Sequence, residues 1–330
     1  MTYSFVAIRR PDGYVGKPSE AGTEVFNMAM GTSNSDVPAF VSGFVTDFAI
    51  NRQPTATENW WTQFRLTGDK YVITNSTAAE ASSTPNKWDY NNGWYAATSN
   101  QSAYLSWMWK RGAGFDVVAF QGTAANPGPS YAHGLGQTPE LKIIKRRNAS
   151  STGWIGTGTI VSQAMAGNLT SAKDYYFYLN TSPAAQSSSN YWSGNDTATH
   201  FTVRHGNGEG GGSADPYLCL LFASVDGISK CGTYAPSSSY TTVTCGFQPR
   251  FVIVKAITKD NTWSVADSLR GMTAGNDPAL ALNEDWENDK YGGADWIDVS
   301  ATGFTVNSTG GVGTADANSN GETYIYYAHA

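Results

Sequence analysis

A phrase that runs from a turn through a strand to a tryptophan occurs three times along the chain, and such internal repetition restricts the fold more than any single motif. Its versions are "SGFVTDFAINRQPTATENWW" (residues 42–61), "HGLGQTPELKIIKRRNASSTGW" (133–154) and "CGFQPRFVIVKAITKDNTW" (245–263). We align their last tryptophans as Trp61, Trp154 and Trp263. The sequence therefore predicts three copies of one structural unit.

The residues after each tryptophan extend this correspondence. A short apolar strand ends in an asparagine, namely Asn75, Asn180 or Asn283, and another tryptophan follows 13, 12 or 13 residues later. The interval between the first tryptophan and the asparagine is 14, 26 or 20 residues, which is typical of a variable loop on a constant frame. Each unit then closes with an alternating strand that starts at Tyr104, Tyr217 or Tyr324.

These patterns predict an all-β protein of three tandem antiparallel β-sandwich or jelly-roll-like repeats, each of about 90–112 residues. Apolar runs are short and alternate with a period of two, and only 15% of the residues are charged. Helical patterns are weak and confined to Thr77–Ser82 and Ser268–Met272. The expected domains are an incomplete repeat with its connector (1–42) and repeats over 43–133, 134–245 and 246–330.

The N-terminal segment is similar to the closing strand of a unit. "YSFVAIRRPDGY", from Tyr3, aligns without a gap with the segments that begin at Tyr104 and Tyr217. Either the chain is the C-terminal piece of a longer polypeptide, or residues 3–10 pair with another chain by strand addition. Both explanations predict an unpaired strand edge near the N-terminus.

Charge and hydropathy argue against two classes of partner. The net charge is -6 and "KIIKRR" (142–147) is the one basic run, so we expect no nucleic-acid binding. No apolar run reaches 18 residues, so we expect no membrane-spanning segment. The cysteines, Cys219, Cys231 and Cys245, are expected to be small buried apolar residues, with a Cys231–Cys245 bridge as the alternative.

The sequence indicates neither a catalytic nor a cofactor-binding site, and we expect the protein not to be an enzyme. The four histidines lack zinc-site spacing, no G-x-S-x-G elbow occurs, and the glycine-rich residues 206–216 fit a hairpin loop. His329 occupies the position of Trp109 and Phe222 in the other closing strands, which suggests a packed aromatic residue.

One acidic segment, "NEDWENDK" (283–290), offers the only candidate ligands for a metal ion. Its carboxylates could hold Ca²⁺, although the matching loops of the other units carry little charge, and a solvated acidic loop is the alternative. These candidate ligands are Glu284, Asp285, Glu287 and Asp289.

Aromatic side chains outside the repeated positions are the candidates for ligand contact, because a residue that recurs in each unit most simply fills the core. The candidate contact residues are Trp60, Tyr90, Tyr95, Tyr191, Trp286 and Tyr291.

Several segments together resemble the repeat-bearing virion proteins of tailed phages, especially those of marine and cyanobacterial phages. The resemblance rests on "GFQPRFVIVKAITKDNTWSVADSLRG", "LFASVDGISKCGTY", "WMWKRGAGFDVVAFQGT" and the terminal "YIYYAHA", and it covers essentially the whole chain. In that family the units often follow a laminin-G-like or concanavalin-like domain of a tail fiber. The resemblance supplies no catalytic or ligand-binding residues.

The resemblance implies a structural protein of the virion, active outside cells as a tail-fiber or host-adhesion segment with stacked repeats and variable loops. Its expected partners are further copies of itself in a trimer or filament, other virion proteins, and a glycan or protein of the host surface. Two alternatives stay open. One is an array of carbohydrate-binding modules, and the other is a filament or lattice subunit that assembles through residues 3–10.

Overall fold

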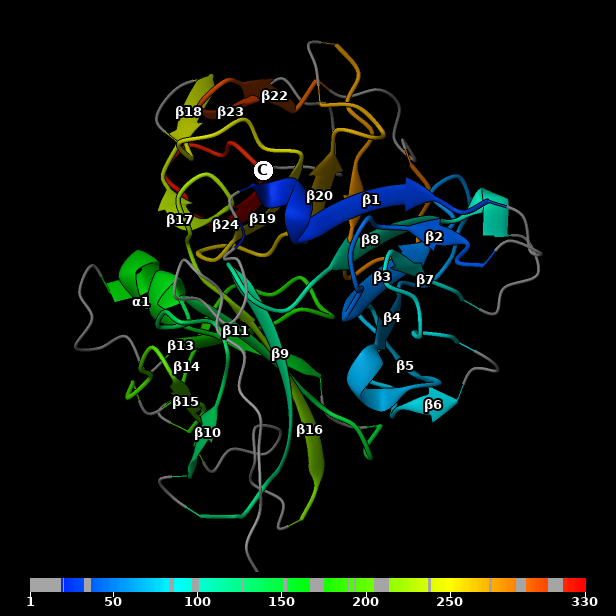
Figure 1. Cartoon of the computed structure of the whole chain (residues 1–330). Coiled ribbons are helices and arrows are strands. Elements are labelled where there is room, and N and C mark those ends of the chain that lie inside the picture. Colours follow the sequence, from blue (N-terminus) through cyan, green and yellow to red (C-terminus); the bar gives the residue numbers. More distant parts are fainter. Residues whose placement is uncertain are drawn as a thin grey trace, which may run out of the picture.

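Figure 1 shows the computed structural model, in which strands form three lobes around a common centre. The fold is all-β and antiparallel, as the sequence predicted. The residues that the structure describes are 19, 21–32, 37–82, 86–96, 101–125, 128–150, 153–166, 175–188, 190–192, 194–204, 214–236, 239–272, 275–288, 295–307 and 317–330. Residues 3–10, on which the strand-addition hypothesis depends, lie outside this part.

The first large sheet, called sheet 1, lies at the right in Figure 1 and has six strands. Its order across the sheet is β1 (Phe26–Met30), β8 (Leu105–Trp109), β3 (Phe48–Arg52), β4 (Trp61–Phe64), β5 (Lys70–Ile73) and β6 (Ala81–Ser82).

Sheet 2 repeats this order with the next part of the chain. It runs β9 (Phe115–Gln121), β16 (Pro216–Phe222), β11 (Leu141–Arg146), β12 (Trp154–Thr157), β13 (Tyr175–Tyr178) and β14 (Gln186–Ser187).

Sheet 3 follows the same order and has five strands. It runs β17 (Ser229–Tyr234), β24 (Tyr324–His329), β19 (Phe251–Ala256), β20 (Ser264–Asp267) and β21 (Leu280–Ala281). In all three sheets the closing strand of the unit lies second from the edge, between the first strand and the strand of the repeated phrase.

A small sheet covers the outer face of each large one. The small sheets are β2 (Phe40–Val41) with β7 (Gly93–Trp94), β10 (Ser130–Ala132) with β15 (His200–Thr202), and β18 (Tyr240–Thr244) with β23 (Gly303–Asn307) and β22 (Ile297–Ser300). The remaining elements are η1 (Gly22–Glu24), η2 (Arg65–Thr67), η3 (Gln101–Ala103) and α1 (Thr159–Ala166). The helix α1 lies outside both segments in which the sequence showed a weak helical pattern, one of which contains β6.

The inner faces of the three sheets share one hydrophobic core. Residues from every sheet belong to it, among them Trp107, Leu220 and Tyr327 of the three closing strands. Because side chains alternate along a strand, the intervening residues of β24, such as Tyr326, point instead into a second core under the small sheet of that unit. Similar outer cores lie under the other two small sheets. The units therefore meet around a common centre, whereas a stack would bring each unit into contact with its neighbours alone.

The strand pairing also shows where one unit passes into the next. The strand β9 lies inside the range 43–133 expected for the first repeat, but it pairs along its length with β16 of sheet 2. Likewise β17 pairs with β24 of sheet 3, and β1, from the range 1–42, pairs with β8 of sheet 1. The closing strands β8 and β16 are thus each followed by the edge strand of the next sheet, which sequence similarity between copies does not indicate.

Gly156 provides a test of how tightly the inner face is packed. A Cβ atom at this position would lie 1.8 Å from the Phe177 ring, whereas the equivalent positions hold Thr62 beside Val72 and Val265 beside Leu280. We expect Gly156→Ala to lower the free energy of unfolding by about 1–3 kcal/mol in urea denaturation. The double variant Gly156→Ala/Phe177→Leu should recover much of this loss, and additive losses would contradict the packing argument.

Candidate functional site

A buried tryptophan at the start of the fourth strand joins each sheet to a neighbouring one. The indole nitrogen of Trp154 donates a hydrogen bond of 2.8 Å to the carbonyl of Ile73 in sheet 1. Trp263 donates at 3.1 Å to Tyr178 in sheet 2, and Trp60 at 2.7 Å to Ala281 in sheet 3. Each sheet thus donates one such bond and accepts another, so the three junctions form a closed cycle.

The repeated asparagines hold these tryptophans in place. The Oδ1 atom of Asn180 accepts a hydrogen bond of 2.8 Å from the backbone N–H of Trp154, and Asn283 accepts one of 2.8 Å from Trp263. Asn75 accepts the corresponding bond, of 3.2 Å, from Trp60. The asparagine therefore orients the segment that carries the indole, which explains why it recurs in every unit.

A buried cation accompanies each tryptophan. Arg52, Lys145 and Lys255 lie at equivalent positions, because each pairs with the residue that follows the recurring tyrosine of a closing strand, namely Leu105, Leu218 or Ile325. Each side chain donates to the backbone carbonyl of the residue two positions beyond the asparagine of a neighbouring unit. These bonds are Arg52 to Asp285 (3.2 Å), Lys145 to Thr77 (2.9 Å) and Lys255 to Ser182 (2.8 Å).

Burial lowers the pKa values of these three cations. Removal from water disfavours the charged form, so burial lowers the pKa of Lys255 to about 7 and that of Lys145 to about 8. For Arg52, burial and the nearby charge of Arg270 lower the pKa to about 10. Its guanidinium also lies 4.8 Å from the centre of the Trp60 ring, a cation–π contact.

In the first phrase the junction tryptophan is Trp60, whereas the alignment of the sequence had placed Trp61 at this position. Trp60, expected to be a contact residue, is 1% exposed and forms the junction, whereas Trp61 begins β4 and is half-buried on the outer face. Strand alternation explains the difference, because Trp60 and the core residue Phe64 are an even number of residues apart. Counting back from Phe64 in steps of two would have placed Trp60 inside.

The acidic segment serves the junction between sheets 1 and 3. The carbonyls of Asp285 and Trp286 accept hydrogen bonds from Arg52, and Asp285 also accepts one from the backbone N–H of Glu58. The side chain of Glu284 accepts from Asn283, and Glu287 is exposed. Asp289 lies outside the described residues. Within the described ranges, no three His, Cys, Asp or Glu side chains come close enough together to hold a metal ion.

The other candidate contact residues are dispersed. Tyr90 is half-buried, and Tyr95 is half-buried beneath the ammonium group of Lys87, 5.2 Å from its ring centre. Tyr191 packs on Tyr176 with ring centres 4.0 Å apart. Trp286 is 8% exposed and so does not lie on the surface, while Tyr291 falls outside the described residues. The structure does not bring these residues together at one site.

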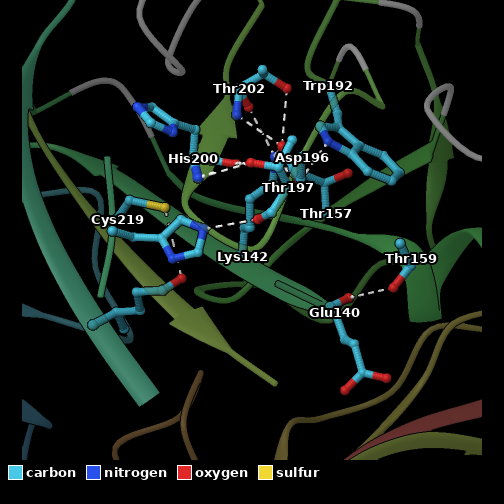
Figure 2. A network of polar contacts seen from close by, with 12 residues as sticks. Glu140, Lys142, Thr157, Thr159, Trp192, Asp196, Thr197, His200, Thr202 and Cys219 are labelled. Atoms are coloured by element: carbon cyan, nitrogen blue, oxygen red, sulfur yellow. Dashed lines mark hydrogen bonds and ion pairs between the residues drawn. The ribbon is translucent and has the colours of Figure 1, made fainter. Parts of the chain in front are cut away.

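A buried polar network distinguishes the second unit (Figure 2). The ammonium group of Lys142 lies 2.9 Å from the carboxylate of Asp196, and both side chains are almost fully buried. Asp196 also accepts hydrogen bonds from the indole of Trp192 and from the backbone and hydroxyl of Thr202. All of these donors belong to the chain itself. The ion pair therefore attaches the loop before β15 to the outer face of sheet 2.

The three cysteines and His329 are buried residues with reactive side chains. All three cysteines are buried, as expected from the sequence, and none of them forms a disulfide. Burial raises the pKa of Cys245 to about 12. His329 packs against Phe26, and burial lowers its pKa to about 3, so it stays neutral as a core aromatic residue. No helix among the described residues has the length and apolar character needed to cross a membrane.

Comparison with known proteins assigns the chain to a family. Residues 30–330 match the family described as a domain of unknown function, DUF7483. The chain belongs to this family. No curated protein and no solved structure matches the chain. The matched residues begin at the end of β1 and contain all three junctions.

The junction tryptophans give a stability prediction. We expect Trp154→Ala to lower the free energy of unfolding by about 3–5 kcal/mol, because it leaves a large cavity and removes the hydrogen bond to the carbonyl of Ile73. Trp61→Ala, at a half-buried tryptophan, is the matched control and should cost less than about 1 kcal/mol in the same urea titration. Equal losses would contradict the assignment of the junction.

The buried lysine of sheet 3 gives a pH prediction. Unfolded lysine keeps its proton up to a pKa of about 10.5, whereas folded Lys255 loses it near pH 7. Between these values the unfolded state binds more protons, so the contribution of Lys255 to stability increases as the pH rises. We expect the free energy of unfolding to gain less between pH 7 and 9 in Lys255→Met than in the wild type. Lys230→Met, at a half-buried lysine of β17, should follow the wild type, and an unchanged slope for Lys255→Met would refute the shift.

Proposed function

We propose that the chain is a non-enzymatic structural and adhesion module of a tailed-phage virion, working outside cells in a tail fiber or another part that contacts the host. The resemblance of its repeats and connectors to phage virion proteins supports this function. The observation that carries it is the contrast between three equivalent junctions and three different outer surfaces. Such a frame can present variable contact residues without change to its core.

The hydrophobic core shared by the three sheets supports a structural role in an exposed part of a virion. An inner core drawn from all three sheets makes each unit depend on the other two. None of the three cysteines forms a disulfide. Rigidity of this kind reduces the entropy lost when a surface is contacted. On this proposal the partners are further copies of the chain in a trimer or filament, other virion proteins, and a glycan or protein on the host surface.

An array of carbohydrate-binding modules is the second candidate function. The observation that favours it is a group of half-exposed aromatic rings around Trp61 on the outer face of sheet 1. The two functions are compatible, since adhesion to a host surface often proceeds through sugars. They differ in whether the chain is part of a virion.

Immunogold electron microscopy tests the virion assignment. Antibodies raised against the purified chain should label the tail region of virions isolated from the organism that encodes it, and mass spectrometry of the same particles should detect the chain. Pre-immune serum serves as the control. Purified virions that contain their capsid proteins but lack the chain would refute the proposal.

Light scattering coupled to size-exclusion chromatography tests the expected self-association. A trimer or extended filament supports an appendage, and a variant that lacks residues 3–10 separates the two modes of assembly. Filaments that disappear on this deletion indicate strand addition, whereas unchanged assembly excludes it. A strict monomer that contacts neither host cells nor virion proteins contradicts the adhesion module.

A further inference from the structure

Two aromatic side chains form a half-exposed pair on the outer face of sheet 1. Trp61 on β4 and Tyr71 on the neighbouring strand β5 meet edge to face, with ring centres 4.8 Å apart and planes inclined by 70°. Both residues are half-buried, so part of each ring reaches solvent. The pair offers an apolar surface of fixed orientation on a rigid sheet.

A carboxylate lies beside this pair and connects it to a third ring. The Oε1 atom of Glu58 accepts hydrogen bonds from the indole N–H of Trp61 at 3.0 Å and from the hydroxyl of Tyr104 at 2.5 Å. Its Oε2 atom accepts the backbone N–H of Gln53 at 3.2 Å. These bonds fix Glu58 with acceptor capacity left over, because a carboxylate has about four lone-pair sites.

The cover of sheet 1 stops short of this group. The small sheet of β2 and β7 packs on Ala49 and Met108, and the indole of Trp94 donates to the hydroxyl of Ser106. Tyr104 lies at the margin of that outer core and stays half-buried. Among the described residues, the rings of Trp61, Tyr71 and Tyr104 therefore lie beside this cover, and all three residues are half-buried.

Within this group Trp61 is particular to the first unit, whereas Tyr104 recurs as Tyr217 and Tyr324. Strand register places Ile155 and Ser264 at the position of Trp61 in sheets 2 and 3. The junction tryptophans, by contrast, recur in every unit. Sheets 2 and 3 form the same junctions without a tryptophan at the position of Trp61. The indole of Trp61 and the Glu58 carboxylate that binds it are therefore expected to have a role specific to the outer face of sheet 1.

We propose that Glu58, Trp61, Tyr71 and Tyr104 form a saccharide-binding site. The apolar C–H face of a pyranose would lie on the rings of Trp61 and Tyr71, whose π-faces carry partial negative charge. A hydroxyl group at the sugar edge would donate to the remaining lone pair on Oε2 of Glu58, a charge-assisted hydrogen bond. A few oriented polar groups beside an apolar surface are typical of small-ligand sites.

Charge restricts the class of sugar. Glu58 is an acceptor and carries negative charge, so it favours neutral or amino sugars and repels sialic and uronic acids. The proposal rests on the adhesion function above and names the part of the host surface that sheet 1 would contact. It also moves sugar recognition from the six tryptophans and tyrosines expected from the sequence to a surface centred on Trp61.

A glycan array tests the site. The purified full chain is applied to immobilised neutral, amino, sialylated and uronic-acid glycans, together with Trp61→Ala and Tyr71→Ala. We expect the wild type to bind neutral or amino glycans, and each variant to lose at least about tenfold in affinity. Tyr240→Ala, at a tyrosine that is 59% exposed on sheet 3's cover, is the matched control and should bind as the wild type does.

Thermal unfolding of each variant shows whether it is folded, and the two ring variants give independent readings. Glu58→Gln keeps an acceptor oxygen and loses the charge, so it should weaken glycan binding severalfold with little change in melting temperature. Wild-type binding that both ring variants retain would overturn the site and leave the adhesion function intact. A wild type that binds host cells and no glycan would overturn the saccharide class alone, and absence of the chain from virions would count against the virion function alone.

Discussion

The bond from an indole N–H to a carbonyl of another sheet is the interaction on which the architecture depends. Trp60, Trp154 and Trp263 each supply one such bond, and the three bonds close a cycle. No sheet can leave the cycle without exposing a buried tryptophan and breaking the hydrogen bond of its indole, which is costly in a dry core. The three units are therefore expected to fold as one cooperative body, with a shared core inside and a separate small core outside each sheet.

The same junctions also bury one cation in each unit. Arg52, Lys145 and Lys255 donate to backbone carbonyls of the neighbouring unit, and these carbonyls belong to segments of different sequence. The long side chain of an arginine or lysine can bind such a segment whatever its side chains are, because it needs only one backbone oxygen atom as acceptor. The frame thus tolerates divergence in its loops, and this tolerance is what an adhesion module with changing contact surfaces requires.

The outer faces differ because little in the frame constrains them. Sheet 2 carries the buried pair of Lys142 and Asp196, while sheet 1 carries the half-exposed group around Trp61. The sequence alone drew attention to aromatic richness and to the possibility of sugar contact, but it selected Trp60 for that role. Adjacent tryptophans point to opposite faces of a strand, so an alignment shifted by one residue exchanges a core residue for a surface residue.

Repetition and alternation in the sequence were sufficient to predict antiparallel β-structure, the equivalent closing strands, the repeated asparagines and the buried cysteines, because these features depend on local period and spacing. They could not show that β9 and β17 join the sheet that follows them, that the units surround one core, or that the acidic loop meets Arg52. Strand partners and junctions are contacts between residues far apart in the chain. Only the tertiary structure decides them, since they depend on which faces remain to be buried once each sheet has formed.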